Sequence, residues 1–301
     1  MAISLGGGGS ASVINETINI NSAENLITLA DGRVYLKGGV TESDTATYPD
    51  APAKIGYSGT SFSVASEAIT PVGIAWDGSY FWVLDTYQNR VYKYNSAGVY
   101  QSFSFAVGAQ GVNPTDIVWD GTYFWVLNNQ TSPLKRVSKY SAAGVYQNVF
   151  WEYNAVTTMD GEGLAWDGTY FWVVGNATDT IRKFNAAGVD QGVSYSVAAQ
   201  ETNPKGITFD GTYLWVVGTN SAVGTTLSWA YKYNTSGVYQ NESFLVESQD
   251  TVPQGILSVG TDLWMVGLTN DAAYKYSNQI GVNSVSSGSA AAGQQNYVRI
   301  K

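Results

Sequence analysis

The sequence predicts an all-β fold: a five-bladed β-propeller of four-stranded blades, closed by an N-terminal outer strand and carrying extended N- and C-terminal arms. One string recurs along the chain at intervals of about 43 to 49 residues, and strand-like segments follow each copy. Several short strands in a unit of this length are typical of propeller blades. The copies are GIAWDGSYFWVLD (73–85), DIVWDGTYFWVLN (116–128), GLAWDGTYFWVVG (163–175), GITFDGTYLWVVG (206–218) and the divergent GILSVGTDLWMVG (255–267).

The first two strands of each unit form a hairpin in this prediction. Asp-Gly separates an apolar run from an alternating aromatic run, and it favours a hairpin turn because Gly adopts positive φ without steric cost and Asp tolerates it. In four units a proline precedes the first strand, where a missing backbone N–H costs nothing. The first strands are expected to begin near Gly73, Asp116, Gly163, Gly206 and Gly255, and the prolines are Pro71, Pro114, Pro204 and Pro253.

The third and fourth strands complete the blades and suggest how the ring closes. The last unit lacks a fourth strand, and residues 60–65 resemble the missing one. We therefore expect these residues to complete the last blade, which removes an exposed sheet edge. The expected domains are an arm and linker at 1–53, the propeller at 54–281 and a tail of small residues at 282–301. Third strands are expected through Tyr92, Lys139, Lys183, Tyr231 and Tyr274, and fourth strands near Phe103, Phe150, Tyr195 and Phe244.

Composition excludes several classes of function. The net charge of −9 disfavours a nucleic-acid partner, because binding to phosphates depends on clustered Lys and Arg. The chain contains no Cys and no His, which excludes Ser-His-Asp catalysis, Cys-His catalysis and thiolate metal sites and leaves carboxylate chemistry. Neither a signal peptide nor an apolar stretch of transmembrane length is recognised. We expect no cofactor, no bound metal and no membrane insertion.

The repeated aromatic and acidic residues are predicted to build the fold. Burial of a Trp ring stabilises a protein by on the order of 5 kcal/mol, so identical rings at identical blade positions favour packing between blades. The Asp of the Asp-Gly turns could bind calcium in principle, but turn chemistry explains it without a metal. The rings are Trp82, Trp125, Trp172, Trp215 and Trp264, with Trp76, Trp119 and Trp166, and the turn residues are Asp77, Asp120, Asp167 and Asp210.

Function is expected where the repeats differ. The loops between second and third strands vary in length and composition, and they share one face with the segments that enter each first strand. Aromatic residues without a counterpart in other blades stand there amid Asn, Gln, Thr and Asp, as on a surface that stacks against carbohydrate, although each ring could instead anchor its own loop. The candidates are Tyr87, Gln88, Asn129, Gln130, Tyr153, Asn176, Asp179, Trp229 and Asn270.

A carbohydrate-active enzyme is the alternative from another class. Asp116 and Glu162 begin the first strands of adjacent blades, near the expected central channel, and Lys205 stands at the next blade. Two carboxyl groups about 5 to 10 Å apart are what glycoside hydrolysis requires. No surrounding motif supports catalysis, however, and these residues could simply line a wet channel.

The two ends of the chain differ from the repeats. ENLITLADGRVYLKGG (24–39) alternates in polarity and predicts a hairpin at Asp31-Gly32, and the chain finishes in the strand-like YVRIK. Together with MAISLGGGGSAS and DGRVYLKGGVTESDTATYPDA, these ends resemble those of bacteriophage tail-fibre and other virion proteins. The repeated blade is similar to NHL-type propeller repeats.

The resemblance implies a position and partners. It implies a virion structural protein at the particle surface, a short tail fibre, spike or other adsorption component, whose propeller binds a host surface glycan or protein. The N-terminal arm would bind other virion proteins, and the chain would form a homo-oligomer, with a trimer as one option. No coiled-coil or repeat shaft is present, so a capsid or tail decoration protein, or a free lectin, remains an alternative. The docking residues implied are Leu26, Ile27, Leu29, Val34, Tyr35 and Leu36.

Overall fold

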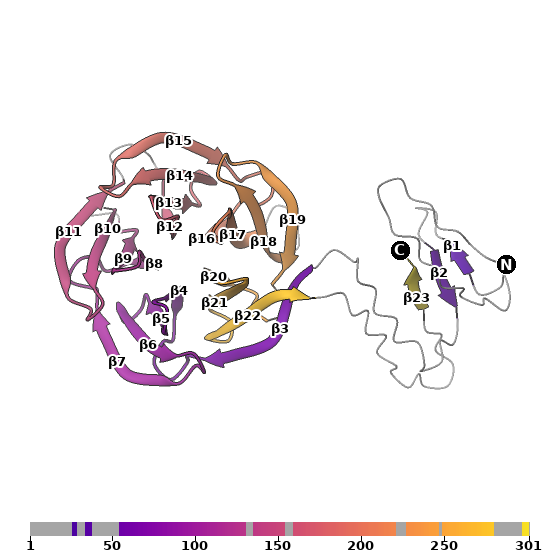
Figure 1. Cartoon of the computed structure of the whole chain (residues 1–301), viewed down its shortest axis with the longest axis horizontal. Coiled ribbons are helices and arrows are strands. Elements are labelled where there is room, and N and C mark those ends of the chain that lie inside the picture. The colour runs from indigo at the N-terminus through magenta and orange to yellow at the C-terminus, as the bar shows by residue number, and fades with distance from the viewer. Residues whose placement is uncertain are drawn as a thin grey trace. The chain divides into compact units, whose positions relative to one another are not determined.

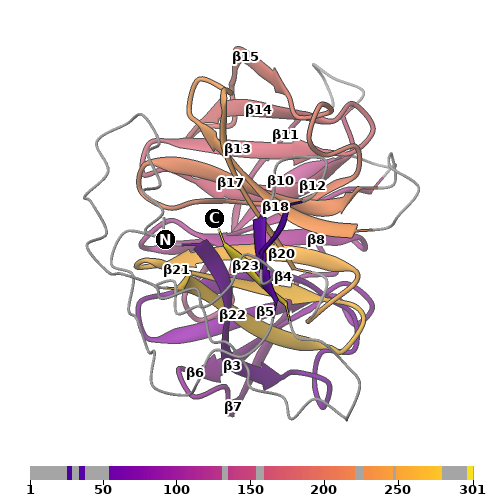
Figure 2. The same cartoon turned by 90° about the vertical axis from the view of Figure 1, so that its right-hand side faces the viewer.

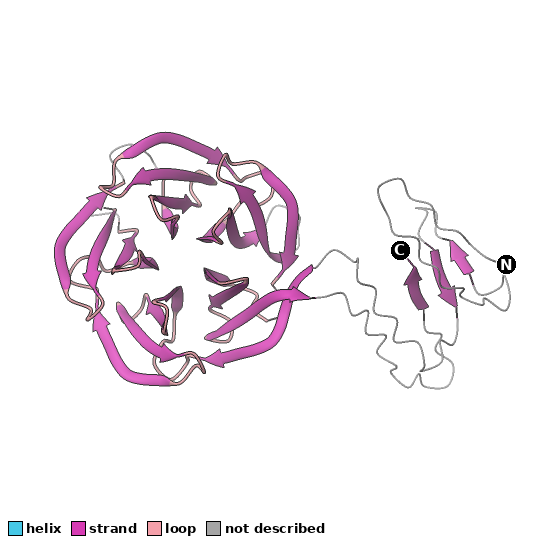
Figure 3. Cartoon of the chain, viewed as in Figure 1, coloured by secondary structure: helices cyan, strands magenta, loops and turns pink. Residues whose placement is uncertain are grey.

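The computed structural model describes residues 26–28, 34–37, 54–130, 135–153, 159–220, 227–246, 249–279 and 297–300. These residues contain strands and turns and no helix (Figure 3). They divide into two units, one comprising 53–280 and the other 1–52 together with 281–301. The larger unit is a ring of five four-stranded antiparallel sheets (Figure 1). The predicted all-β, five-bladed propeller is confirmed.

Each blade runs outward from the ring centre, from its first to its fourth strand. Blade 1 holds β4 (Pro71–Trp76), β5 (Tyr80–Asp85), β6 (Arg90–Asn95) and β7 (Tyr100–Ala106), and blade 2 holds β8 (Pro114–Trp119), β9 (Tyr123–Asn128), β10 (Arg136–Ser141) and β11 (Tyr146–Glu152). Blade 3 holds β12 (Gly161–Trp166), β13 (Tyr170–Gly175), β14 (Thr180–Asn185) and β15 (Asp190–Ser196). Blade 4 holds β16 (Pro204–Phe209), β17 (Tyr213–Asn220), β18 (Leu227–Asn234) and β19 (Tyr239–Leu245).

Blade 5 is completed by a strand from the other end of the propeller sequence. It holds β20 (Pro253–Val259), β21 (Asp262–Gly267) and β22 (Ala272–Gln279), and its fourth strand is β3 (Lys54–Ser63). β3 pairs antiparallel with β22, from Ser63 opposite Ala272 to Lys54 opposite Gln279. The closing strand therefore begins six residues before the expected 60–65 and ends within that range. It leaves β22 without a free edge, which protects the ring from edge-to-edge pairing.

Aromatic rings pack the blades against one another. The Phe81 ring of blade 1 lies 4.7 Å from Trp264 of blade 5, and the Phe124 ring of blade 2 lies 4.8 Å from Trp82 of blade 1. The Trp125 ring lies 5.0 Å from Phe171 of blade 3. All five repeated second-strand Trp side chains are buried. The repeated string thus forms the contacts between blades, as its aromatic content predicts.

The ring has two different faces. One carries the turns between first and second strands and between third and fourth strands, and we call it the turn face. The other carries the loops between second and third strands and the crossover segments that enter each first strand, and we call it the loop face. Figure 2 turns the chain by 90°, so that the sheets are seen from the side of the ring.

The smaller unit is built from both ends of the chain. β1 (Leu26–Thr28) pairs antiparallel with β2 (Val34–Lys37), with Leu26 opposite Leu36, in agreement with the expected hairpin. On its other edge β2 pairs with β23 (Tyr297–Ile300), with Val34 opposite Ile300. Leu29, one of the residues implied in docking, lies outside the described residues. The pairing of β2 with β23 was not predicted from the sequence, and it places the two ends in one sheet.

Candidate functional site

Buried acidic side chains hold the loops of the loop face. Asp85, at the end of β5, is fully buried and accepts hydrogen bonds from the backbone N–H groups of Thr70 (2.7 Å) and Gln88 (2.6 Å). Glu201 accepts one from the N–H of Asn203 at 2.9 Å, and Asp250 accepts one from the N–H of Val252 at 2.8 Å. Each carboxylate bonds backbone groups that would otherwise lack a partner, so the loops are fixed in shape.

Two of these carboxylates occupy space that a glycine leaves free. A Cβ at Gly218 would lie 2.7 Å from Glu201 Cδ, and a Cβ at Gly267 would lie 2.6 Å from Asp250 Cγ. In blades 4 and 5 the carboxylate comes from the crossover segment and the glycine from the second strand. In blade 1 the carboxylate comes from the second strand, because Asp85 stands at the position that Gly218 and Gly267 occupy in those blades. Burial raises the pKa of Glu201 to about 7, and its Oε2 atom lacks a hydrogen-bond partner among the described residues.

Several of the predicted recognition residues lie on the loop face, but most are tied into it. Tyr87 is 74% exposed. Gln88 donates to the carbonyl of Glu67, and Asn270 donates to the carbonyl of Gln249. The Gln130 side chain accepts a bond from the N–H of Val112 at 3.1 Å. Gln88, Asn270 and Gln130 therefore shape the loops and expose only part of their hydrogen-bonding groups.

The remaining candidates are partly buried. Trp229 stacks against Tyr231, with ring centroids 6.4 Å apart. Asn129 and Asn176 use their backbone N–H groups to bond the carbonyls of the neighbouring crossover segments, at Asn113 and Asp160. Asp179 occupies a turn with φ of +48°, and burial raises the pKa of its carboxyl group. Asn129, Asn176 and Asp179 lie in the predicted loops, whereas Trp229 lies in strand β18, opposite Gly218 of β17 and Leu245 of β19. The contacts of all four are mainly structural.

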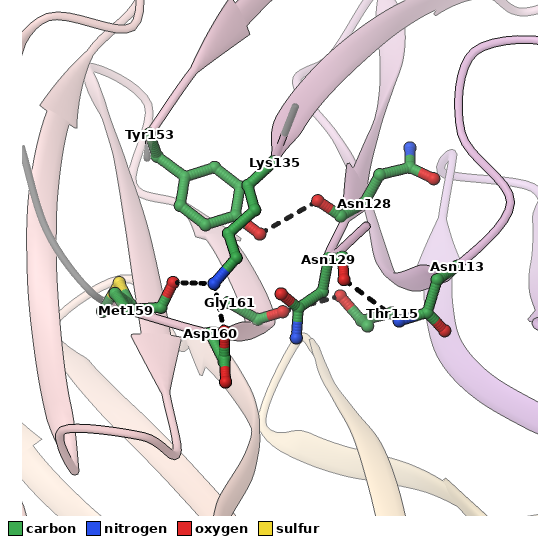
Figure 4. Close-up of polar contacts among 9 residues, drawn as sticks. All are labelled: Asn113, Thr115, Asn128, Asn129, Lys135, Tyr153, Met159, Asp160 and Gly161. Atoms are coloured by element: carbon green, nitrogen blue, oxygen red, sulfur yellow. Dashed lines mark hydrogen bonds and ion pairs between the residues drawn. The ribbon is translucent and has the colours of Figure 1, made fainter. Parts of the chain in front are cut away.

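Tyr153 requires a correction. It is fully buried, and its hydroxyl donates a hydrogen bond of 2.9 Å to the carbonyl of Asn128 (Figure 4). The ring lies in a core with Trp151 and Met159, so it cannot stack against a ligand. Tyr153 is thus an anchor for the crossover into blade 3, which is the alternative that the sequence left open for each unrepeated ring.

The crossover into blade 3 is also fastened to blade 2. The Lys135 ammonium group donates to the carbonyl of Met159 at 2.9 Å and forms an ion pair with Asp160 (Figure 4). The Thr115 hydroxyl donates to the carbonyl of Gly161 at 3.0 Å. Blade 3 carries Phe184 where the other third strands carry Tyr94, Tyr140, Tyr233 and Tyr276, whose hydroxyls bond their own crossover segments. Phe184 has no hydroxyl group, so its presence in the repeat was the sequence signal that the crossover into blade 3 is held by other residues.

Apolar side chains are exposed on one part of the loop face, and of these the sequence analysis identified Tyr87 alone. Ile69, Val112 and Val252 lie in crossover segments, and Tyr87 and Leu268 lie in loops between second and third strands. Ile69 is 49% exposed and Val112 is 60% exposed. All five belong to blades 5, 1 and 2, which are consecutive in the ring, and we call them the apolar set. Solitary exposed apolar residues are ordinary, but a group on one face is typical of a binding surface.

The two carboxylates of the enzyme hypothesis have different environments. Asp116 is 2% exposed and accepts hydrogen bonds from the N–H groups of Ile117 (2.8 Å) and of Leu164 in blade 3 (2.7 Å). Burial raises its pKa well above the usual range. Glu162 lies 3.4 Å from the Lys205 ammonium group, and burial raises its pKa while Lys205 opposes the shift.

Asp116 fills a seam between blades. At the same position the other blades have glycines, and a Cβ at Gly206 would lie 2.4 Å from the carbonyl oxygen of Gln254. A Cβ at Gly163 would lie 2.8 Å from the backbone nitrogen of Ile207. The first strands therefore approach too closely for most side chains, and Asp116 is accommodated by bonding the backbone of the next blade. Its carboxylate joins two blades and does not line the channel.

The acidic residues of the Asp-Gly turns bond protein groups. Asp77 accepts hydrogen bonds from the N–H groups of Ser79 and Tyr80, both at 2.8 Å, and from the indole of Trp82. Among the residues that the structure describes, no cluster of three or more acidic, His or Cys side chains could hold a metal ion. In that same part of the chain, no helix has the length and apolar character needed to cross a membrane.

Comparison with known proteins supports the fold. No protein-family model and no curated protein matches the chain. The glutaminyl cyclase of Myxococcus xanthus is similar in structure, with a TM-score of 0.56 and 13% identity, over 75% of this chain and 97% of that one. The PQQ-bound aldose sugar dehydrogenase of Streptomyces coelicolor has a TM-score of 0.51 and 11% identity, over 77% and 100% of the two chains. At these identities the likeness concerns the propeller fold alone.

Proposed function

We propose that this chain is a recognition protein whose loop face binds a glycan or protein on a cell surface. The apolar set carries the proposal, because it presents Ile69, Tyr87 and Val112 to solvent on fixed segments. The buried Asp85 carboxylate bonds the backbone beside Ile69 and Tyr87, and the Gln130 side chain bonds the N–H of Val112. Exposed aromatic and aliphatic groups on a fixed surface bind with little loss of conformational freedom. The proposal does not depend on catalysis.

We further propose that the protein belongs to a bacteriophage particle, as a short tail fibre, spike or other adsorption component. The resemblance of both chain ends to virion proteins supports this setting. The three-stranded sheet that joins those ends adds to it, because one compact unit outside the propeller is suited to bind other virion proteins. The propeller would then face the host.

The geometry of Asp116 weighs against the enzyme alternative. Both of its carboxylate oxygens accept backbone hydrogen bonds, and the residue is only 2% exposed. A glycosidase needs two carboxyl groups that both reach the substrate. Glycan binding that persists in Asp116→Asn and Glu162→Gln variants, without turnover, would agree with a binding role.

A cell-binding experiment tests the recognition role. Ile69→Asn, Tyr87→Ala and Val112→Asn are expected to lower binding of the labelled full chain to host cells by at least about tenfold when combined. Val145→Asn and Val189→Asn, at exposed valines of the turn face, are the matched control and should leave binding unchanged. Equal loss in both sets, or no loss in either, would contradict a loop-face binding site.

Purified particles test the virion setting. Mass spectrometry and cryo-EM of particles from the source lysate are expected to find the chain at defined positions, with the ring at the surface. A chain that lacks residues 297–301 loses β23 from the terminal sheet and is expected to be missing from particles, although its propeller still folds. Absence of the full-length chain from particles would exclude a virion role and leave the free lectin.

A further inference from the structure

A groove of about 420 Å³ lies between blades 4 and 5 at the turn face. It lies at the opposite end of the strands from the loop face, because its walls include the Asp-Gly turn of blade 4 and the corresponding turn of blade 5. The residues that line it include Trp215, Lys232, Glu242, Ser258, Thr261 and Asn278. Its volume falls within the range of sites that bind small molecules.

The groove exists because the fifth copy of the repeat lacks an aromatic ring. In the other blades the last residue of the first strand is Trp76, Trp119, Trp166 or Phe209, and blade 5 has Ser258 at this position. In blades 1 to 3 that ring packs 4.5 to 4.6 Å from a Phe of its own blade and fills the seam on that side. Ser258 is too small to do so, and space remains beside Trp215.

A second departure from the repeat occurs in the same groove. Glu242 stands where the fourth strands of blades 1 to 3 have Phe103, Val149 and Val193. Its carboxylate lies 2.8 Å from the Lys232 ammonium group. The equivalent Lys93, Lys139 and Lys183 lie 3.7 Å above the centroids of their Tyr rings, whereas Lys232 lies 4.4 Å above Tyr213. The Lys232 ammonium group is thus farther from its ring in the blade that carries the carboxylate.

The groups in the groove suit a neutral, hydroxyl-rich ligand. Lys232 and Glu242 neutralise each other, and Asp210 already accepts bonds from Thr212, Tyr213 and Trp215. The side chains of Ser258, Thr261 and Asn278 make no hydrogen bond within the part of the chain that the structure describes. A charged ligand would find no uncompensated partner, whereas sugar hydroxyls could bond the paired charges and the hydroxyl and amide groups beside the apolar wall.

We propose that this groove binds a neutral saccharide of one or two sugar units. Two departures from an otherwise repeated sequence, at Ser258 and Glu242, converge on one cavity and give it hydroxyl and carboxylate groups in place of apolar ones. The proposal is independent of the loop-face site, since the two lie at opposite ends of the strands.

Calorimetric titration of the full chain tests the proposal. The probes are glucose, galactose, mannose, N-acetylglucosamine, maltose and lactose, and at least one is expected to bind with a dissociation constant below about 10 mM. Ser258→Trp restores the ring of blades 1 to 3 and should weaken that binding at least about 30-fold. Glu242→Val restores the residue of blades 2 and 3 and should weaken it about 3- to 10-fold.

Val145→Asn, at an exposed valine of the turn face in blade 2, is the matched control, and it should leave sugar binding unchanged because Val145 does not line the groove between blades 4 and 5. If the Ser258→Trp protein does not fold, the loss of sugar binding in the Glu242→Val protein tests the proposal instead. Failure of all six sugars to bind would overturn the proposal, as would binding that both groove variants retain or that Val145→Asn abolishes. A loss of cell binding in the Tyr87→Ala protein with sugar binding intact separates this site from the loop face.

Discussion

The indole N–H of Trp82 donates a hydrogen bond of 2.8 Å to Oδ2 of Asp77. The same bond recurs in the next three blades, from Trp125 to Asp120, from Trp172 to Asp167 and from Trp215 to Asp210. Because the other oxygen of Asp77 bonds the N–H groups of its own turn, one carboxylate fastens the hairpin turn to the second strand. This bond accounts for the joint presence of the turn Asp and the second-strand Trp in four copies of the repeated string.

Removal of one such carboxylate should destabilise the propeller. Asp120→Ala leaves two turn N–H groups and the Trp125 indole without their acceptor, and it is expected to lower the free energy of unfolding by about 1 to 3 kcal/mol. Urea denaturation followed by tryptophan fluorescence measures the change. Asp262→Ala is the control in blade 5, where the ion pair with Lys275 is partly exposed and its loss should cost less than about 1 kcal/mol. A larger loss in the control would contradict this account of the motif.

A methyl group between first strands should be more damaging than its size suggests. Gly206→Ala places a Cβ 2.4 Å from the carbonyl oxygen of Gln254 and 3.0 Å from the nitrogen of Ile256, so the backbone of β20 must move. We expect a loss of about 2 to 4 kcal/mol in the free energy of unfolding. Gly108→Ala meets only the Asn89 side chain, at 3.1 Å, and should change stability by less than about 1 kcal/mol. Equal effects of the two changes would show that the seam is not tightly packed.

The buried Glu201 should make stability depend on pH. Its ordinary pKa of 4.5 is raised to about 7 by burial, so the folded state holds a proton that the unfolded state releases between these values. Stability is therefore full below about pH 4.5 and falls as the pH rises toward 7, by about 1 to 3 kcal/mol. Glu201→Gln should be more stable than the original protein at pH 8 and similar to it at pH 5, in paired urea titrations. A variant that gains nothing at pH 8 would show that Glu201 is ionised without penalty.

Loss of the closing strand should open the ring. A chain that begins at residue 64 lacks β3, and β22 then presents a free edge next to buried rings. Such an edge is expected to pair with another chain, so light scattering should detect dimers or aggregates. A chain that begins at residue 54 retains β3 and is the control for loss of the arm. A monomeric, stable protein without β3 would contradict the role of this strand in closure.

The fold could be predicted from the sequence because it depends on repeated local signals. The Asp-Gly turns, the prolines and the period of the Trp residues all indicated the same blade, and the structure confirms it, with the four prolines as the first residues of their strands. The pairing of β2 with β23 could not be predicted, since two short strands far apart in sequence carry no signal of register. The start of β3 was placed too late for a similar reason, because only part of it resembles the repeat.

The candidate site was harder to predict because exposure is not a local property. Tyr153 and Tyr87 are both unrepeated aromatics in loops, yet the first is fully buried and the second is exposed. The sequence position of Asp116 predicts a carboxylate near the channel. The structure shows instead that it accepts a hydrogen bond from the backbone N–H of Leu164 in the next blade. Val112 and Ile69, in contrast, were passed over because aliphatic residues suggest a core. Ser258 is the clearest missed signal, since a single replaced ring marks the groove.

The register of β3 on β22 determines how the propeller would respond to a pulling force. Lys54 and Gln279, where the chain enters and leaves the ring, are paired directly opposite each other. A pull that separates these two residues would break the hydrogen bonds between β3 and β22 one pair at a time, which requires little force. β2 and β23 also pair, so the two segments that leave the ring are joined again in a second sheet, and a pull that separates Lys54 from Gln279 must also break that pairing.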